Sequence, residues 1–570
     1  MAGVEKLITD HIDVWTSAIK KRNATGRGSN KKIELTGIKK LRELILELAV
    51  RGKLVPQDAS DEPASVLLEK IAEEKAQLIA DKKIKKQKPL PKITDEEKPF
   101  ELPKGWSEAR FGEVYLMEYG DNLPKPKRSD TGEYMVYGSN GVVGSHNKSS
   151  VQGPCIVIGR KGSAGALNLS KDDGCWVTDV AYSVTPPNGV DLDFAFKQFH
   201  TLGLTTLGKG IKPGLNRNEA NLVVISIPPL AEQQRIVAKV DELMALCDQL
   251  EQQTEQSLSA HQTLVEVLLA SLTSDISTDG DSNEDFQTSW QRIAEHFDVL
   301  FTTEASIEQL KQTILQLAVM GKLVPQNPND EPASVLLEKI AEEKAQLIAE
   351  KKIKKQKPLP AITDEEKPFE LPTGWAFERL GNLTSRLGSG STPRGGKSAY
   401  VDTGIIFLRS QNVWNDGLKL NDTAYITEET HHKMENTHVF PNDVLLNITG
   451  ASLGRSTIFP EKLVTANVSQ HVTIIRLLET SMCEFVHLGI KSPLVQKLVW
   501  GRQVGMAIEG LSKKVLEQFE FPVPPLAEQH RIVAKVDELM ALCEQLKARL
   551  ADAQTTQLHL ADAVVENALN

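Results

Sequence analysis

Basic side chains recur on loops rich in glycine and asparagine in two stretches of this 570-residue chain. Arginine and lysine can bond guanine in the major groove of DNA, while asparagine and glutamine can bond adenine. Loops of this composition could therefore read bases. The basic residues in these loops are Lys125, Lys127, Arg128, Arg160, Lys161, Lys209, Lys212, Arg217, Arg394, Lys397 and Arg502.

The residue patterns of common catalytic sites do not occur. Residues 390–398 resemble a phosphate-binding loop, but Gly396 stands where that loop requires lysine. No Pro-Pro pair has the flanking residues of an adenine methyltransferase motif. The pair His431-His432 lacks the spacing of a helical zinc site and is expected on the surface. The five cysteines form no CxxC pair, which argues against a cysteine-rich zinc site. Because none of these patterns is present, we expect no catalytic, cofactor-binding or metal-binding residues.

The net charge of −10 is unevenly distributed and argues against a simple phosphate-binding protein. Residues 107–226 carry equal numbers of acidic and basic residues, and residues 376–522 carry one more basic than acidic residue. The acidity therefore belongs to the remainder of the chain. Two segments with this balance could read bases while a partner supplies much of the attraction to phosphates.

Two internal repeats organise the chain. Residues 52–106 recur at 321–375, with 49 of 55 positions identical. Residues 230–250 recur at 526–546 with two differences. The chain is therefore a tandem repeat of two halves.

The segments between the repeats, 107–226 and 376–522, do not match each other. We interpret the near-identical flanks as meeting the same partner twice, and the dissimilar middles as meeting two different targets. Gene conversion confined to the flanks is the alternative, but it leaves the divergence of the middles unexplained. The acidic, serine-rich stretch at 271–285 is expected to be a solvated connector between the halves.

The flanks are predicted to be helical, with a coiled-coil seam after Pro228-Pro229 and after Pro524-Pro525. Apolar residues there step four and three positions apart, at Ile236, Val240, Leu243, Cys247 and Leu250, and again at Ile532, Val536, Leu539, Cys543, Leu546 and Leu550. The middles contain short β-rich runs punctuated by glycine and asparagine, which are typical of a compact mixed α/β domain.

A basic run with five lysines ends the helical part of each 55-residue repeat, at 82–88 and 351–357. A solvated helix end is one reading of this run. Contact with an acidic partner or with DNA is the other.

These motifs together resemble the DNA-specificity subunits of type I restriction–modification enzymes, most closely the type IB branch. The resemblance rests on AVRGKLVPQ, DEPASVLLEKI, ELPKGW, PPLAEQ and RIVAKVDELMALC, and it covers essentially the whole chain. It implies an α+β fold, with two mixed α/β target recognition domains joined by long antiparallel coiled-coil helices in a pseudo-two-fold tandem repeat. The implied regions are a helical region 1–106, a first recognition domain 107–226, a central conserved region 227–375, a second recognition domain 376–522 and a C-terminal coiled-coil helix 523–570.

The resemblance also implies a non-catalytic, cytoplasmic subunit that reads a bipartite, asymmetric DNA site. Its implied partners are double-stranded DNA, two methyltransferase subunits and the translocating restriction subunits, with no membrane. The chain itself would bind no cofactor, because S-adenosylmethionine, ATP and magnesium are expected on those partner subunits. A nuclease with an unrecognised site and a scaffold that bridges two identical proteins without reading DNA are the rival functions.

Carried over by position, the resemblance places further base-reading residues in the loops of both recognition domains. In the first domain these are Ser139, Asn140, Ser163 and Thr178. In the second domain they are Arg409, Ser410, Gln411, Asn412, Thr449, Ser452, Asn467, Ser469, Gln470 and His471. A turn or a satisfied polar group is the alternative at each position.

Overall fold

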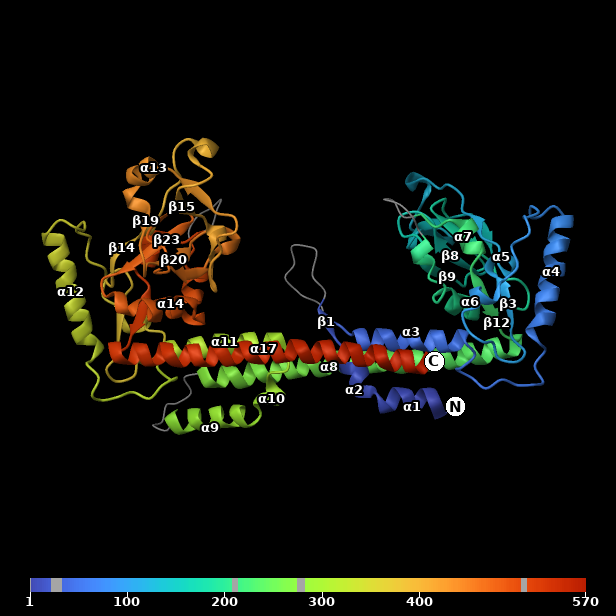
Figure 1. The fold of residues 1–570 in the computed structure, drawn as a ribbon, viewed down its shortest axis with the longest axis horizontal. Coiled ribbons are helices and arrows are strands. Elements are labelled where there is room, and N and C mark those ends of the chain that lie inside the picture. Colours follow the sequence, from blue (N-terminus) through green and yellow to red (C-terminus); the bar gives the residue numbers. More distant parts are fainter. Residues whose placement is uncertain (1, 22–32, 208–213, 274–281, 504–509, 570) are drawn as a thin grey trace. The chain divides into compact units, whose positions relative to one another are not determined.

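The computed structural model describes residues 2–21, 33–207, 214–273, 282–503 and 510–569. The chain forms two compact units, of which unit 1 contains residues 1–257 and 552–570 and unit 2 contains residues 258–551. Each unit combines helices with small sheets (Figure 1). Among the described helices, none is long and apolar enough to cross a membrane.

Two helices of 44 residues, α8 (Leu230–Thr273) and α17 (Leu526–Leu569), each begin in one unit and end in the other. The other helices of unit 1 are α1 (Ala2–Asp10), α2 (Ile12–Ser17), α3 (Thr36–Val50), α4 (Ala64–Ala80), α5 (Phe111–Val114), α6 (Leu192–Phe199) and α7 (Arg217–Asn221). Those of unit 2 are α9 (Ser282–Glu295), α10 (Phe297–Leu300), α11 (Glu304–Val319), α12 (Ala333–Ala349), α13 (Glu428–Lys433), α14 (Cys483–Lys491), α15 (Pro493–Gly501) and α16 (Lys513–Leu516).

The connector predicted at 271–285 is shorter than expected. Helix α8 continues to Thr273 and α9 begins at Ser282, so both ends of the predicted connector are helical. Residues 274–281 lie outside the described residues.

In unit 1, α3 bonds to both the start of α8 and the end of α17. Arg42 pairs with Asp248 at 2.6 Å and with Glu251 at 2.6 Å, whereas Ser226, just before α8, donates to the carbonyl of Val50 at the far end of α3. Helices α3 and α8 are therefore antiparallel. Lys40 pairs with Asp562, and Lys53 donates to the carbonyl of Leu569, so α17 runs along α3 in the same direction. Within this unit the two long helices are thus antiparallel.

The heptad seams are buried at most of the predicted positions, whereas Leu250, Leu539, Leu546 and Leu550 are half-buried. Ile236, Val240, Leu243 and Cys247 are each at most 1% exposed. In unit 2, the end of α8, α11 and the start of α17 share one apolar core, which includes Val265, Leu269, Ile307, Leu310, Ile532 and Val536. Burial of this apolar surface, rather than helix propensity, is what holds long helices with so many polar residues together.

The strands of unit 1 form two four-stranded sheets and one two-stranded ladder. The strand orders are β6-β5-β10-β7, β4-β11-β8-β9 and β12-β3, and β5 and β10 are parallel. The strands β1 (Lys20–Lys21) and β2 (Ile33–Glu34) form a further antiparallel pair, which lies apart from them in sequence. The strands are β3 (Ser107–Arg110), β4 (Glu118–Tyr119), β5 (Tyr134–Gly138), β6 (Gly141–His146), β7 (Val151–Gln152), β8 (Cys155–Gly159), β9 (Leu167–Ser170), β10 (Gly174–Val177), β11 (Ala181–Val184) and β12 (Val224–Ile227).

Unit 2 repeats this sheet topology although its sequence differs. The orders β18-β15-β22-β19, β14-β23-β20-β21 and β13-β24 match those of unit 1 strand for strand, and β15 and β22 are again the parallel pair. The strands are β13 (Ala376–Arg379), β14 (Thr384–Ser389), β15 (Ile405–Leu408), β16 (Val413–Trp414), β17 (Gly417–Leu418), β18 (Ala424–Ile426), β19 (His438–Val439), β20 (Val444–Asn447), β21 (Ser456–Ile458), β22 (Ala466–Val468), β23 (Val472–Leu477) and β24 (Glu520–Val523). The structure therefore confirms the predicted α+β fold class and its tandem repeat.

A buried carboxylate joins the two repeated motifs within each unit. Glu232 at the start of α8 is 1% exposed and accepts hydrogen bonds from Trp106 Nε1 at 3.0 Å and Gln57 Nε2 at 3.1 Å. Glu528 accepts the same bonds in unit 2, from Trp375 at 3.1 Å and Gln326 at 3.3 Å. Part of the near-identity of the repeats is thus explained by packing inside the chain rather than by a shared partner.

Replacing Glu232 by glutamine should leave unit 1 as stable as before at pH 7, or more stable by up to about 1 kcal/mol. Burial raises the pKa of Glu232 above 4.5. A carboxyl with a raised pKa stabilises the fold below pH 4.5 and loses that contribution as the pH rises through the raised value. Glutamine keeps an acceptor oxygen for Trp106 and removes the charge, so its advantage should vanish at pH 4. Urea unfolding at both pH values measures this, and a clear loss of stability at pH 7 would contradict it.

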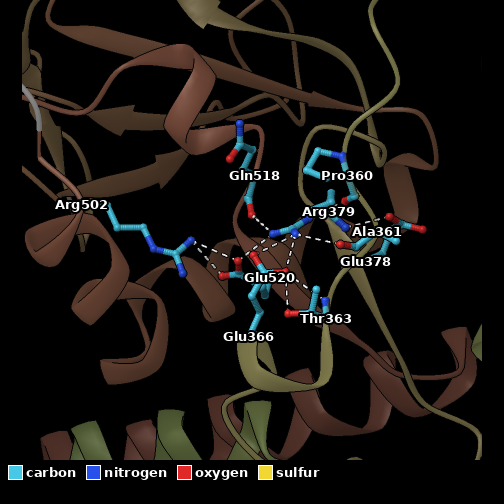
Figure 2. Close-up of polar contacts among 9 residues, drawn as sticks. All are labelled: Pro360, Ala361, Thr363, Glu366, Glu378, Arg379, Arg502, Gln518 and Glu520. Carbon is cyan, nitrogen blue, oxygen red and sulfur yellow. Dashed lines mark hydrogen bonds and ion pairs between the residues drawn. The ribbon is translucent and has the colours of Figure 1, made fainter.

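A buried arginine holds each repeated segment on the sheet of its own unit, and we call this contact the arginine latch. In unit 2, the guanidinium of Arg379 on β13 is surrounded by acceptors from two segments, residues 360–366 and 518–520 (Figure 2). The acceptors are the carbonyls of Pro360 at 3.0 Å, Ala361 at 3.3 Å and Gln518 at 2.7 Å, and the carboxylates of Glu366 at 2.7 Å and Glu520 at 2.6 Å.

Arg110 forms the latch of unit 1 with the carbonyls of Pro91, Lys92 and Leu222 and the carboxylate of Glu97. Val224 pairs with Arg110 in the strand register, as Glu520 pairs with Arg379. The latch of unit 1 therefore lacks the buried carboxylate of unit 2.

Candidate nucleic-acid interface

Two arginines and an exposed tyrosine meet where β4, β8 and α7 come together in unit 1. The guanidinium carbon of Arg160 lies 5.1 Å from the ring centroid of Tyr119, and that of Arg217 lies 4.9 Å from it. Arg160 also lies 5.9 Å from the ring of Tyr182. Because Tyr119 is 52% exposed, the two cations are held on an aromatic surface that solvent can reach.

The backbone fixes this cluster. Arg160 donates to the carbonyl of Val180 at 2.8 Å and accepts from the amide of Leu215 at 2.9 Å, and Lys161 bridges to Gly214. Lys161 and Asn216 line the same shallow groove as the two arginines. Burial raises the pKa of Tyr182 to about 12, so its hydroxyl stays protonated and donates to the carbonyl of Leu215. The groove thus presents cations and an amide in a preset geometry, as base recognition requires.

The equivalent backbone position in unit 2 carries different side chains. Leu511 donates to the carbonyl of Ile448 at 2.9 Å, and Thr449 bridges to Gly510, as Leu215 and Gly214 do in unit 1. Ile448 therefore takes the place of Arg160.

The neighbouring positions follow from the same alignment. The strand registers pair Tyr182 with Tyr119 and Thr473 with Ser389, so Ser389 takes the place of the tyrosine. Lys513 stands three residues after the bridging glycine, where Arg217 stands in unit 1. The same backbone scaffold thus presents different side chains at equivalent positions in the two units.

Several predicted residues of unit 2 do come together. Thr449 Oγ1 lies 2.7 Å from His471 Nδ1, and Gln470 lies beside His471 and bonds Thr392. A second group surrounds Asp422, which accepts hydrogen bonds from Gln411 and Arg409.

The tryptophan Trp414 was missed by the sequence analysis. Its ring lies 4.2 Å from Lys419 Nζ and 3.8 Å from the guanidinium carbon of Arg455. Tyr119 was missed as well, because both aromatics lie on two-residue strands without periodicity. An aromatic residue next to basic loops was the signal available for both.

Four predicted reading residues are buried, which corrects their assignment as direct contacts. Thr178, Asn412, Asn467 and Ser469 are each at most 4% exposed. Thr178 donates to the carbonyl of Tyr137, Asn412 donates to the carbonyl of Lys419, and Asn467 donates to Thr437. These three side chains hold loops in place. The hydroxyl of Ser469 is buried without a hydrogen-bond partner among the described residues.

His431 is a further correction, because the histidine pair was expected on the surface. His431 is 9% exposed, stacks on His438 with ring centroids 3.7 Å apart and contacts Asn467 through Nδ1. His432 is exposed as predicted.

The remaining predicted residues do not line the Arg160 groove or are engaged elsewhere. Arg128 donates to the carbonyl of Leu123, and Arg502 pairs with Glu520 in the arginine latch. The residues that are exposed or half-buried on loops, turns and short 3-10 turns are Lys125, Lys127, Ser139, Asn140, Ser163, Arg394, Ser410 and Ser452. Lys209 and Lys212 lie outside the described residues, as does the side chain of Lys397.

Comparison with known proteins assigns the family. The family model described as "Type I restriction modification DNA specificity domain" matches residues 103–260 and 372–553. The chain is 42% identical to the type I restriction enzyme EcoAI specificity subunit of Escherichia coli and 38% identical to the EcoEI specificity subunit of the same species, over the full length of both proteins in each case.

A chain from a structural study of type I R-M system assembly and conformational transition is 19% identical. The alignment covers 83% of this chain and 99% of that chain, with a TM-score of 0.44, and at that score it adds nothing to the sequence matches. The full-length matches confirm the resemblance inferred from the repeats, including the type IB branch. The chain belongs to the DNA-specificity subunits of type I restriction enzymes.

Proposed function

We propose that residues 107–226 and 376–522 are two target recognition domains, each reading one half of a bipartite DNA site. The observation that carries this proposal is the shared sheet topology with unlike side chains at equivalent loop positions, such as Arg160 in one domain and Ile448 in the other. A common scaffold fits a common substrate, here double-stranded DNA. Different side chains on it fit different base edges.

In this proposal Arg160, Arg217 and Lys161 read the first half-site, with Tyr119 holding the two arginines in place. Thr449, Gln470 and His471 read the second half-site, and Gln411 with Arg409 forms a further contact region. The buried residues Thr178, Asn412 and Asn467 position these loops.

The chain directs other subunits and does no chemistry itself. Two methyltransferase subunits dock on the repeated regions 1–106, 227–375 and 523–570, and restriction subunits join them in the cytoplasm. S-adenosylmethionine, ATP and magnesium act on those partners. The purified chain with magnesium alone should leave DNA intact, and cleavage would favour a nuclease with an unrecognised site instead.

Replacing residues 107–226 by a second copy of residues 376–522 should make the complex modify a site built from the same half-word twice. The matched strands β3 and β13 at the start of the segment, and β12 and β24 at its end, give equivalent junctions. Methylome sequencing of cells that carry the chimera and its methyltransferase subunit reads the modified site directly. The reverse chimera is the control and should duplicate the other half-word. If both halves of the site changed to new words, the modular proposal would fail.

A further inference from the structure

The lysines of the basic run in each repeat are not among the residues proposed above to read DNA. We define the first lysine run as Lys82, Lys83, Lys85, Lys86 and Lys88, and the second as Lys351, Lys352, Lys354, Lys355 and Lys357. All ten side chains are exposed. Among the described residues, one lysine of each run has a carboxylate partner, Lys83 with Asp81 and Lys352 with Glu350. Each run therefore leaves most of its positive charge unneutralised.

The backbone at the start of each run does not favour lysine. Lys82 and Lys351 follow the C-terminal ends of α4 and α12 with φ of 57° and 60°. Glycine is the residue that adopts this left-handed conformation most easily at a helix end. Both copies nevertheless carry lysine, which points to a use for the side chain.

Each run is fixed to the recognition domain of its own unit on its N-terminal side. Lys75 on α4 donates to the carbonyls of Gly112 at 2.9 Å and Glu113 at 2.7 Å. Lys344 on α12 donates to the carbonyls of Gly381 at 2.7 Å and Asn382 at 3.4 Å. Figure 1 shows α4 beside the sheets of unit 1 and α12 beside those of unit 2.

The arginine latch fixes each run on its C-terminal side. Arg110 holds the carbonyls of Pro91 and Lys92, and Arg379 holds those of Pro360 and Ala361. Because both ends are bonded to the domain that carries the reading loops, the run stays in register with that domain.

The composition of the runs fits phosphate better than protein. Lysine is depleted in protein–protein interfaces, whereas the DNA backbone is bound largely by lysine and arginine. The five lysines are the same in both copies, although the recognition domains beside them differ. A contact that does not depend on base sequence, such as the phosphate backbone, has this property. The recognition domains are close to neutral overall, so their net charge adds little attraction to phosphates.

We propose that the two lysine runs bind the phosphate backbone of the DNA next to each half-site and supply sequence-independent affinity. This rests on the proposed reading function of the neighbouring domains. In this proposal, this chain supplies part of the attraction to DNA phosphates, and its partner subunits supply the rest.

The test uses the full chain assembled with its methyltransferase subunits. One variant carries Lys82→Gln, Lys83→Gln, Lys85→Gln, Lys86→Gln and Lys88→Gln, and a matched control carries arginine at the same five positions. The equilibrium constant for a duplex with the target site and for a random duplex is measured over a range of KCl concentrations. The slope of log K against log salt should shrink by about 2 or more in the glutamine variant, since each lost phosphate contact removes about 0.9. The arginine control should keep the slope of the parent complex.

The glutamine variant should weaken both duplexes by the same factor and leave sequence preference unchanged. Replacing the five lysines of the second run by glutamine should have the same effect on both duplexes. An unchanged slope would make the runs solvated helix ends and overturn the proposal. Failure of the glutamine variant to assemble with the methyltransferase, measured by light scattering without DNA, would assign the runs to protein docking and also overturn it. The slope of log K against log salt on random DNA does not depend on sequence preference. It therefore tests the lysine runs even if the recognition domains do not read bases.

Discussion

Replacing Arg379 by methionine should destabilise unit 2 by about 3–5 kcal/mol, because it leaves a buried carboxylate without its main partner. Arg379 and Glu520 are 3% and 2% exposed and lie 2.6 Å apart. The change also removes the donors for three carbonyls. Urea unfolding followed by hydrogen exchange in β13 and β24 measures the loss locally, which matters because the chain has two units.

Unit 1 supplies the controls for this prediction. Glu520→Val copies the valine that stands at position 224, and it should cost much less than Arg379→Met because Arg379 keeps its other acceptors. Arg110→Met should also cost less, since no buried carboxylate is left behind. Equal losses for Arg379→Met and Glu520→Val would contradict the asymmetry between the two latches.

The arginine latch also carries an acid dependence. Hydrogen bonds from the Thr363 amide and from Arg379 lower the pKa of Glu366 to about 2. A lowered pKa stabilises the fold above pH 4.5, and this contribution is lost as the pH falls toward 2. The parent chain should therefore lose more stability than Arg379→Met between these pH values.

Replacing Arg160 by alanine should weaken binding to the target site by roughly 10- to 100-fold, which corresponds to about 1–3 kcal/mol for one arginine–guanine contact. Binding to random DNA should fall far less. The base preference should relax in one half-site only, as read by binding to a randomised duplex library.

Two variants sharpen this expectation. Arg160→Lys keeps the charge but loses the planar fork, so it should restore salt dependence without restoring base preference. Ile448→Ala, at the equivalent position of unit 2, should leave the first half-site untouched. A similar loss on target and random DNA for Arg160→Ala would mean that Arg160 contacts phosphate and does not read bases.

The helices could be predicted because their signal is local. The spacing of Ile236, Val240, Leu243 and Cys247 already contains the buried seam, and the structure buries all four. The shared topology of the two variable segments could not be predicted, because strand order depends on pairings between distant residues. The sequence contains little indication of the arginine latch. Arg110 and Arg379 are separated by the same offset as the two copies of the first repeat, but both lie just outside that repeat.

The reading residues were predicted unevenly for a physical reason. Arg160, Lys161 and Arg217 gather at one groove, as their charge and loop position indicated. Asn467 is of a residue type that can read bases, but its side chain is hydrogen-bonded to His431 and Thr437, which are about thirty residues away in sequence. Whether a polar loop residue is free or satisfied depends on such distant neighbours.

Helix α17 has a consequence for the order in which the protein can mature. The helical layer of unit 1 includes residues 552–569, where Ala561 is fully buried and Asp562 pairs with Lys40. The first half of the chain therefore leaves the ribosome with part of its apolar helix face uncovered. That face stays uncovered until residues 552–569 have been translated, so it is exposed to aggregation while the whole of unit 2 is being made.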